Sequence, residues 1–363
     1  MAGGDIMKIG IVGGNSQVGT ELAFLLRDSG HEVIPIVRSR RAGGLLGSNG
    51  FNCRIGSITD RDEASELLAE LDAVIIAAYA AASSRNVLGY REAWQTNTAI
   101  VDNSINESSD DATVIYLSTV SAFGNKRYDS LLKGRFDHYT ISKRRLERRF
   151  RKRARSYGKS PYVLRLGYVH GPLQSKTRNL REALQGTDRA VIRVSGDAGS
   201  NVVHTVTVAA AVERCLDQSL DPGRYTVIDN PRWSWSKLID RYSPSGVELE
   251  FSPGSSQSIV SSAANRVLGY VTDFAIGQKD KLMSFQVVLP TSINERIVYR
   301  YQREVAMGRL RGYDFERVVT YDIPEFEANP VEGNTVENLE NINKLLERES
   351  VIQDALDSGF SCS

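Results

Sequence analysis

The sequence predicts an α/β protein in which helices cover both faces of a doubly wound parallel sheet of about seven strands, followed by a smaller, mixed C-terminal part. Two observations support this prediction. Short apolar runs alternate with amphipathic helical segments through the first two thirds of the chain, as they do in consecutive strand-helix-strand units. The first apolar run also ends in a glycine-rich turn that opens a helix.

This first strand, turn and helix occupy residues 8–30, where glycines follow an apolar run and Val18, Leu22, Leu25 and Leu26 recur at helical spacing. The pattern is that of a Rossmann-type dinucleotide-binding unit, because a pyrophosphate can approach the backbone N–H groups at the N-terminus of the helix. A purely structural turn between strand and helix is the alternative. Ser16 stands where many such loops have a third glycine. The expected phosphate contacts are Gly13, Asn15, Ser16, Gln17, Val18 and Gly19.

A second apolar strand is expected at residues 31–37, and it ends in the cationic run Arg38-Ser39-Arg40-Arg41. In this type of fold the end of the second strand meets the adenosine ribose. An acidic residue there binds the 2′-hydroxyl of NAD, whereas an arginine accommodates the 2′-phosphate of NADP. No Asp or Glu lies between Val33 and Asp60. The sequence therefore favours NADP, with Arg38 as the first candidate contact and NAD as the alternative; a solvated basic loop is the other interpretation of this run.

Composition and charge argue against several classes of function. The chain has 363 residues and a formal net charge of +1, so the overall balance gives no reason to expect a nucleic-acid or membrane partner. Cys53, Cys215 and Cys362 are scattered, which fits neither a disulfide framework nor a metal site and favours a reducing compartment. No apolar run is long enough to cross a membrane. We therefore expect a soluble, cytoplasmic protein without a metal centre.

The remaining elements follow the same alternation. Further strands are expected at residues 52–55, 72–78, 113–118, 162–166 and 225–228, and helices near residues 63–71, 90–106 and 139–157. A dinucleotide-binding domain is expected to span residues 7–171 and to receive residues 204–230. The substrate-binding part is then expected to comprise residues 172–203 and 231–363, with an unassigned extension from about residue 246.

A candidate proton-transfer site follows the fifth strand. Thr119 ends that strand, and Tyr139 and Lys143 lie four residues apart on the next helix, so that their side chains share a face. A free phenol titrates near pH ~10. A neighbouring cation favours its ionised form, which makes the tyrosine a better proton carrier near neutral pH. A surface tyrosine beside a basic helix is the alternative interpretation.

Several motifs together resemble one known family. They are the Gly13–Gly19 loop, Asp72–Ala78, Asn97, Tyr116–Gly124, Tyr139 with Lys143, Leu164–Pro172 and Val203–Val206. Over about residues 8–242 the chain resembles the extended short-chain dehydrogenases/reductases, also called the NAD-dependent epimerase/dehydratase family. The resemblance implies that Tyr139 is the acid/base, that Thr119 and Lys143 are its partners, and that Asn97 supports them. It further implies cofactor contacts at Ser57, Ile58, Ala77, Ala78, Tyr139, Lys143, Gly167 and Val169, and a substrate that is often a nucleotide sugar.

Departures from the family pattern bear on the reaction. Ser16, Ser57, Tyr79 and Thr207 replace the usual glycine, aspartate, alanine and aspartate. Sugar-nucleotide dehydratases usually have an Asp-Glu pair after the catalytic threonine, whereas this chain has Val120-Ser121, which argues against water elimination. The expected function is an NADP(H)-dependent oxidoreductase acting on a carbonyl or secondary alcohol, with a nucleotide sugar as one candidate substrate. An NAD(P)-dependent nucleotide-sugar epimerase and a non-catalytic dinucleotide sensor are the alternatives.

Three further features have no assigned role. The basic segment 143–155 is more typical of a solvated face than of a partner-binding surface, and its charge disfavours, without excluding, a homodimer through this helix. Residues 294–308 are expected to form a helix, and residues 335–356 have an apolar stripe typical of core or oligomer contact. His31, His138, His170 and His204 are isolated in the sequence and are expected to be structural.

Overall fold

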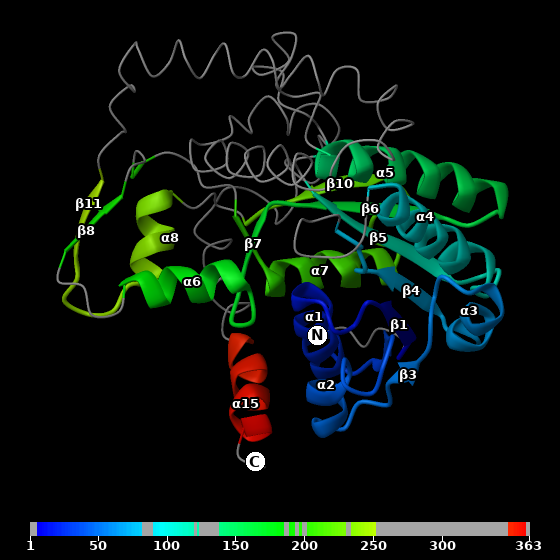
Figure 1. The fold of residues 1–363 in the computed structure, drawn as a ribbon, viewed down its shortest axis with the longest axis horizontal. Coiled ribbons are helices and arrows are strands. Elements are labelled where there is room, and N and C mark those ends of the chain that lie inside the picture. Colours follow the sequence, from blue (N-terminus) through cyan, green and yellow to red (C-terminus); the bar gives the residue numbers. More distant parts are fainter. Residues whose placement is uncertain are drawn as a thin grey trace, which may run out of the picture.

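The computed structural model describes residues 6–81, 90–119, 122, 138–184, 189–192, 196–197, 202–229, 234–251 and 348–360 (Figure 1). The expected helix at residues 294–308 therefore lies outside the described residues. Within the described part of the chain, no helix is both long and apolar enough to cross a membrane.

The central element is a sheet of seven strands in the order β10-β6-β5-β4-β1-β2-β3, in which all neighbouring strands run parallel. Its strands are β1 (Lys8–Val12), β2 (Glu32–Val37), β3 (Arg54–Ile55), β4 (Ala73–Ile76), β5 (Thr113–Thr119), β6 (Pro161–Leu166) and β10 (Arg224–Val227). This confirms the predicted fold class. Strands β3, β4 and β10 begin or end one or two residues away from the expected positions.

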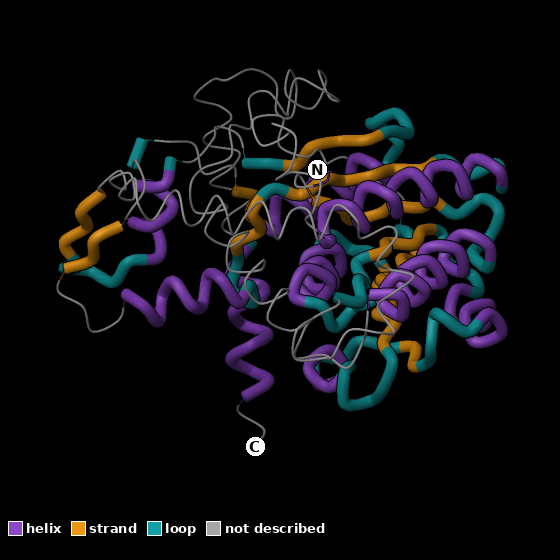
Figure 2. The backbone as a smooth tube through the Cα atoms, turned by 45° about the horizontal axis from the view of Figure 1, so that its top comes forward, coloured by secondary structure: helices purple, strands orange, loops and turns teal. Residues whose placement is uncertain are grey.

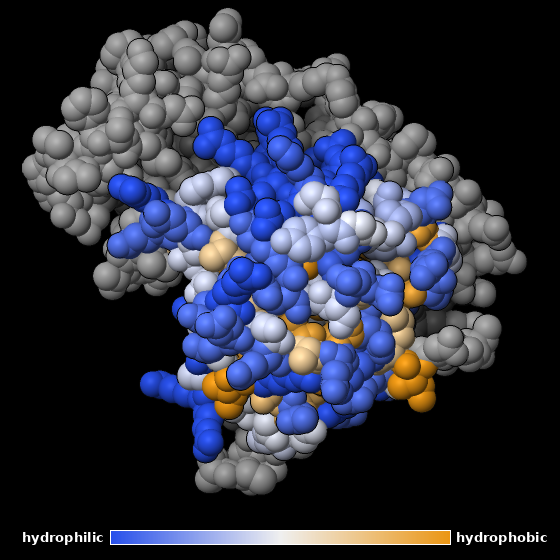
Figure 3. Space-filling view, turned by 90° about the vertical axis from the view of Figure 1, so that its right-hand side faces the viewer, coloured by the Kyte–Doolittle hydropathy of each residue, from blue (hydrophilic) through white to orange (hydrophobic). Residues whose placement is uncertain are grey.

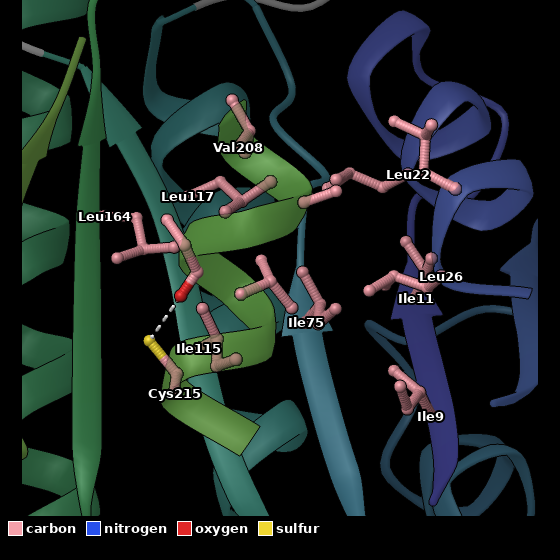
Figure 4. Packing of buried hydrophobic residues seen from close by; sticks show 14 of the residues in the cluster. Ile9, Ile11, Leu22, Leu26, Ile75, Ile115, Leu117, Leu164, Val208 and Cys215 are labelled. Atoms are coloured by element: carbon pink, nitrogen blue, oxygen red, sulfur yellow. Dashed lines mark hydrogen bonds between the residues drawn. The ribbon is translucent and has the colours of Figure 1, made fainter. Parts of the chain in front are cut away.

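Helices cover both faces because alternate strand residues point to opposite sides. On one face, Ile75, Ile115 and Leu117 share a cluster with Leu22 of α1 (Gln17–Asp28) and Val208 of α7 (Thr205–Leu216) (Figure 4). On the other face, Val74, Val114 and Tyr116 belong to a second cluster with apolar residues of three other helices. Those helices are α3 (Arg61–Leu68), α4 (Tyr90–Asn106) and α5 (His138–Ser156). The short helix α2 (Gly44–Ser48), after β2, was not predicted.

Smaller elements that the sequence did not predict lie beyond β6. Strand β7 (Tyr168–His170) pairs with β9 (Val202–His204), and β8 (Arg189–Ile192) pairs with β11 (Glu248–Phe251). Figure 2 shows the β8-β11 ribbon apart from the main sheet. Helices α6 (Ser175–Leu184) and α8 (Trp235–Tyr242) belong to the same part of the chain and pack against each other.

The last described helix, α15 (Glu349–Phe360), packs against α1 near the beginning of the chain. Ile352 is fully buried in the cluster that contains α1 and α7, and Leu356 packs against it. The apolar stripe predicted for residues 335–356 is therefore a core contact where the structure describes it. The helix itself begins at Glu349, and residues 335–347 of the stripe lie outside the described residues.

Helix α5 has one apolar side and one cationic side. Leu146, Phe150 and Ala154 are buried against the sheet. Arg145, Arg148, Arg149, Lys152 and Arg155 are exposed, and they make this face of the molecule strongly hydrophilic (Figure 3). These cationic side chains therefore face away from the core, and the choice between a solvated and a partner-binding face stays a prediction.

Candidate functional site

The loop between β1 and α1 has the geometry that a bound pyrophosphate requires. Gly13 has a φ of +80°, and a Cβ built on it would lie 2.7 Å from the Cα of Ala78. A Cβ on Gly19 would lie 2.5 Å from the carbonyl oxygen of Gly13. Only glycine fits either position, so the roles predicted for these two residues, a tight turn and close packing of helix on strand, agree with the structure.

Ser16, which replaces the usual glycine, is the N-cap of α1. Its hydroxyl oxygen accepts a hydrogen bond from the Gly19 N–H at 3.1 Å. The N–H groups of Gln17 and Val18 open the helix, and the first N–H groups of a helix have no partner within it. The N-terminus of a helix also carries a partial positive charge from the helix dipole, so these N–H groups can bind a phosphate. Exposed Asn15 lies in the same loop. The residues present therefore fit a dinucleotide cofactor.

The segments after β2 and β3 contain the residues that the sequence analysis expected beside the adenosine of a dinucleotide. Arg38, Arg40 and Arg41 follow β2 directly, and all three are exposed. After β3, the Ser57 N–H donates to Glu63 Oε2 at 2.6 Å, a contact between this segment and α3 that the sequence did not predict. Ile58 is buried in the second core cluster and so forms a fixed part of this edge.

The segment after β4 packs on the loop between β1 and α1 and is also held by α4. The N–H groups of Ala77 and Ala78 both donate to the Val12 carbonyl, which holds this segment against Gly13. Ala80, two residues after Ala78, is held by Asn97 on α4. The Asn97 side-chain amide accepts a hydrogen bond from the Ala80 N–H and donates one to the Ala80 carbonyl, both at 2.8 Å. Asn97 thus fixes the backbone of this segment, and its predicted role as a supporting catalytic residue stays a prediction.

Thr119, Tyr139 and Lys143 lie at the carboxyl end of β5 and on the first turns of α5. Lys143 is 5% exposed, and its ammonium donates to the Leu117 carbonyl at 3.0 Å. Burial lowers the pKa of Lys143 to about 8, although the charge of Glu147 opposes this shift. The ring of Tyr139 meets the ring of Tyr79 edge to face, with centroids 5.1 Å apart.

A buried ion pair between Glu147 on α5 and Arg165 on β6 was not predicted from the sequence. Glu147 accepts hydrogen bonds from the Ser118 hydroxyl at 2.5 Å and from Arg165 at 2.6 Å. It therefore connects α5 with β5 and β6. Gly167, between β6 and β7, donates from its N–H to the Val227 carbonyl, and partly buried Val169 packs on the first core cluster.

A second polar cluster links residues that the sequence analysis treated as isolated. The rings of His170 and His204 meet edge to face, with centroids 4.8 Å apart. His170 contacts Asp229 at 3.0 Å through Nε2 and the Tyr242 hydroxyl at 2.6 Å through Nδ1. Thr207, which replaces a family aspartate, donates its hydroxyl to Asp229. The two histidines are thus neighbours and not isolated, and no short-range sequence signal connects them.

The family follows from comparison with known sequences. A family profile described as NAD dependent epimerase/dehydratase family matches residues 9–227. The chain belongs to this family. This membership confirms the resemblance noted in the sequence and makes the chain an enzyme of the short-chain dehydrogenase/reductase type with a nicotinamide dinucleotide cofactor. A comparison with curated proteins finds no match.

Solved structures of this family share the fold at low sequence identity. One is the UDP-Glc/GlcNAc 4-epimerase of Campylobacter jejuni, with 17% identity and a TM-score of 0.54 over 69% of this chain and 88% of the other. Another is WbmG of Bordetella bronchiseptica in complex with NAD, with 19% identity and a TM-score of 0.53 over 70% and 84%. A third is the dTDP-glucose 4,6-dehydratase of Bacillus anthracis, with 13% identity and a TM-score of 0.52 over 69% and 85%. At these identities the likeness shows the fold.

Proposed function

We propose that the chain is an NADP(H)-dependent oxidoreductase that acts on a carbonyl or secondary alcohol, with a nucleotide-linked sugar as the candidate substrate. The observation that carries the NADP assignment is the end of β2. Arg38 stands there exposed, and the sequence has no Asp or Glu between residues 33 and 59 that could bind a ribose 2′-hydroxyl at that position. Arg40 and Arg41 lie beside it.

The proposed reaction divides the work between cofactor and protein. The bound nicotinamide supplies hydride transfer to or from the substrate carbon. Tyr139 moves the proton between its hydroxyl and the substrate oxygen, and Thr119 holds that oxygen by a hydrogen bond. Lys143 favours the ionised form of Tyr139 through its charge. Gly167 and Val169 border the nicotinamide end.

A nucleotide-sugar epimerase is the second candidate. Its support is that solved structures of the same fold include sugar-nucleotide 4-epimerases, such as the one from Campylobacter jejuni. An epimerase must return the hydride to the same substrate, so it retains its cofactor, whereas a reductase exchanges it with solvent. Cofactor preference and exchange therefore distinguish the two candidates.

Calorimetric titration with NADPH and NADH tests the proposal. A guanidinium meets the 2′-phosphate with charge-assisted hydrogen bonds of roughly 1.5–3 kcal/mol each, reduced by exposure. We expect a preference for NADPH of about tenfold or more. Arg38→Asp should reverse the preference, whereas Arg148→Asp on the distant face of α5 should leave it unchanged. Equal affinities, or a preference for NADH, would place the epimerase first.

The proton-transfer role has its own test, which also addresses the non-catalytic sensor. Tyr139→Phe removes the hydroxyl and keeps the ring that packs on Tyr79. We expect a loss of turnover of at least about 10²-fold with NADPH affinity retained, measured with a substrate found by thermal-shift screening of nucleotide sugars. Unchanged turnover in this variant would mean that Tyr139 is not the acid/base. Absence of turnover by the wild-type chain on any carbonyl compound would support the sensor.

A further inference from the structure

The ammonium of Lys143 lies between two tyrosine rings. Its Nζ is 4.8 Å from the ring centroid of Tyr79 and 4.9 Å from that of Tyr116. Both distances are within the roughly 6 Å at which a cation is attracted to the face of an aromatic ring. Because Lys143 is 5% exposed, little water shields these contacts, and such interactions are stronger in a desolvated site.

Among the described residues, no carboxylate forms an ion pair with the Lys143 ammonium. Glu147, one turn further along α5, is engaged by Ser118 and Arg165. Among the described residues, the titratable groups that act on Lys143 are Tyr79 after β4, Tyr116 on β5 and Glu147 on α5. Tyr139, one turn earlier on α5, contacts Tyr79, and Arg165 on β6 pairs with Glu147. The Leu117 carbonyl, which accepts a charge-assisted hydrogen bond from the ammonium at 3.0 Å, also favours the charged form. The two ring faces therefore act with this carbonyl and with the charge of Glu147 to favour the charged lysine.

Tyr79 also contacts the other proton-transfer residue. Its ring and that of Tyr139 meet at an interplanar angle of 87°, with centroids 5.1 Å apart. Tyr116, by contrast, is a core residue stacked on Phe150. Tyr79 is partly exposed and lies on the segment that Asn97 clamps through Ala80. It is thus the member of this group that can be replaced without removing a core side chain.

We propose that Tyr79 is a positioning residue whose ring face, together with that of Tyr116, holds the Lys143 ammonium charged beside Tyr139. The inference rests on the proposed roles of Tyr139 and Lys143 and adds to them the device that keeps the lysine protonated in a buried site. It also gives a function to the tyrosine that replaces the usual alanine of the family at residue 79.

The test is an NMR titration of Lys143 in the full chain, with lysines labelled at the ε-carbon and the signal assigned by its loss in Lys143→Met. Tyr79→Phe retains the ring face and should leave the pKa of Lys143 within about 0.3 unit of the wild-type value. Tyr79→Leu removes the face and should lower the pKa by roughly half a unit to one unit. Tyr157→Leu, which removes an exposed ring below Arg153 at the far end of α5, should have no effect.

The proposal is overturned if Tyr79→Leu leaves the pKa of Lys143 unchanged, or if Tyr79→Phe lowers it as much as Tyr79→Leu does. Tyr79→Met, a second non-aromatic variant, gives the same comparison if the leucine variant does not fold by circular dichroism. The titration needs neither substrate nor cofactor. A negative titration would therefore overturn the role of Tyr79 without changing the result of the Tyr139→Phe turnover test. A negative turnover test would likewise overturn the role of Tyr139 without changing the titration.

Discussion

Two glycines with similar backbone conformations show how one residue can matter through its surroundings. Gly13 (φ +80°) and Gly30 (φ +98°) both adopt the left-handed region. A Cβ on Gly13 would lie within 2.8 Å of Ala78, whereas a Cβ on Gly30 would have no neighbour within 4 Å. Gly30→Ala should therefore cost only backbone strain, and Gly13→Ala should add a collision between the phosphate loop and the segment after β4.

We expect Gly13→Ala to lower the free energy of unfolding by about 2–4 kcal/mol and Gly30→Ala by about 1–2 kcal/mol, measured by urea denaturation. Gly13→Ala should also weaken NADPH binding, because the loop must move away from Ala78. Equal losses of stability in the two variants would mean that the collision of the new Cβ with Ala78 adds nothing to the loss of unfolding free energy.

At the scale of one element, helix α15 is attached through its first residue. Glu349 contacts Arg241 at 2.5 Å and His204 at 3.6 Å. Burial alone would raise the pKa of Glu349, but its contacts with His204 and Arg241 lower it to about 2. A carboxyl whose pKa is lower in the folded state contributes stability above its unfolded pKa, near 4.5, and loses this contribution as the pH falls toward 2.

Glu349→Gln should thus lower the free energy of unfolding by about 1–3 kcal/mol at pH 7, with a difference from the wild type that shrinks between pH ~4.5 and ~2. The control is Glu250→Gln, because Glu250 pairs with Arg189 at the same 2.5 Å but is 44% exposed. Its loss should stay below about 1 kcal/mol. A difference for Glu349→Gln that persists at pH 2 would contradict the assigned ion pair.

Strands and helices with a long apolar sequence pattern were predictable, and short strands that pair with a distant strand were not. The strands β1, β2, β5 and β6 and the helices α1, α4 and α5 lie within a few residues of their expected positions, because buried parallel strands and amphipathic helices have long apolar patterns. Strands β7 and β9 have three residues each and exist because they pair with each other. No local pattern of three residues distinguishes such a pair from a loop.

At the scale of the molecule, chain segments far apart in sequence complete the same core. Ile352 near the C-terminus packs with α1, and Arg348 donates to the Leu25 carbonyl at the end of that helix. Asp229 after β10, His170 on β7 and Tyr242 on α8 likewise come from three separate segments. Residues near the C-terminus thus pack on the first βαβ unit and hold helix α1, which follows the proposed phosphate loop.

The sequence by itself determined the fold class, the family and the positions of the proposed cofactor and proton-transfer residues. These depend on local features: the glycines at residues 13 and 19, the Arg38 run, and Tyr139 with Lys143 on one helix face. The tertiary structure decided what surrounds them, including Tyr79 and Tyr116 around Lys143, Asn97 on the Ala80 backbone, and the meeting of His170 with His204. The physical reason is that periodicity and turn chemistry act over a few residues, whereas burial, charge and ring contacts depend on which distant segments the sheet brings together.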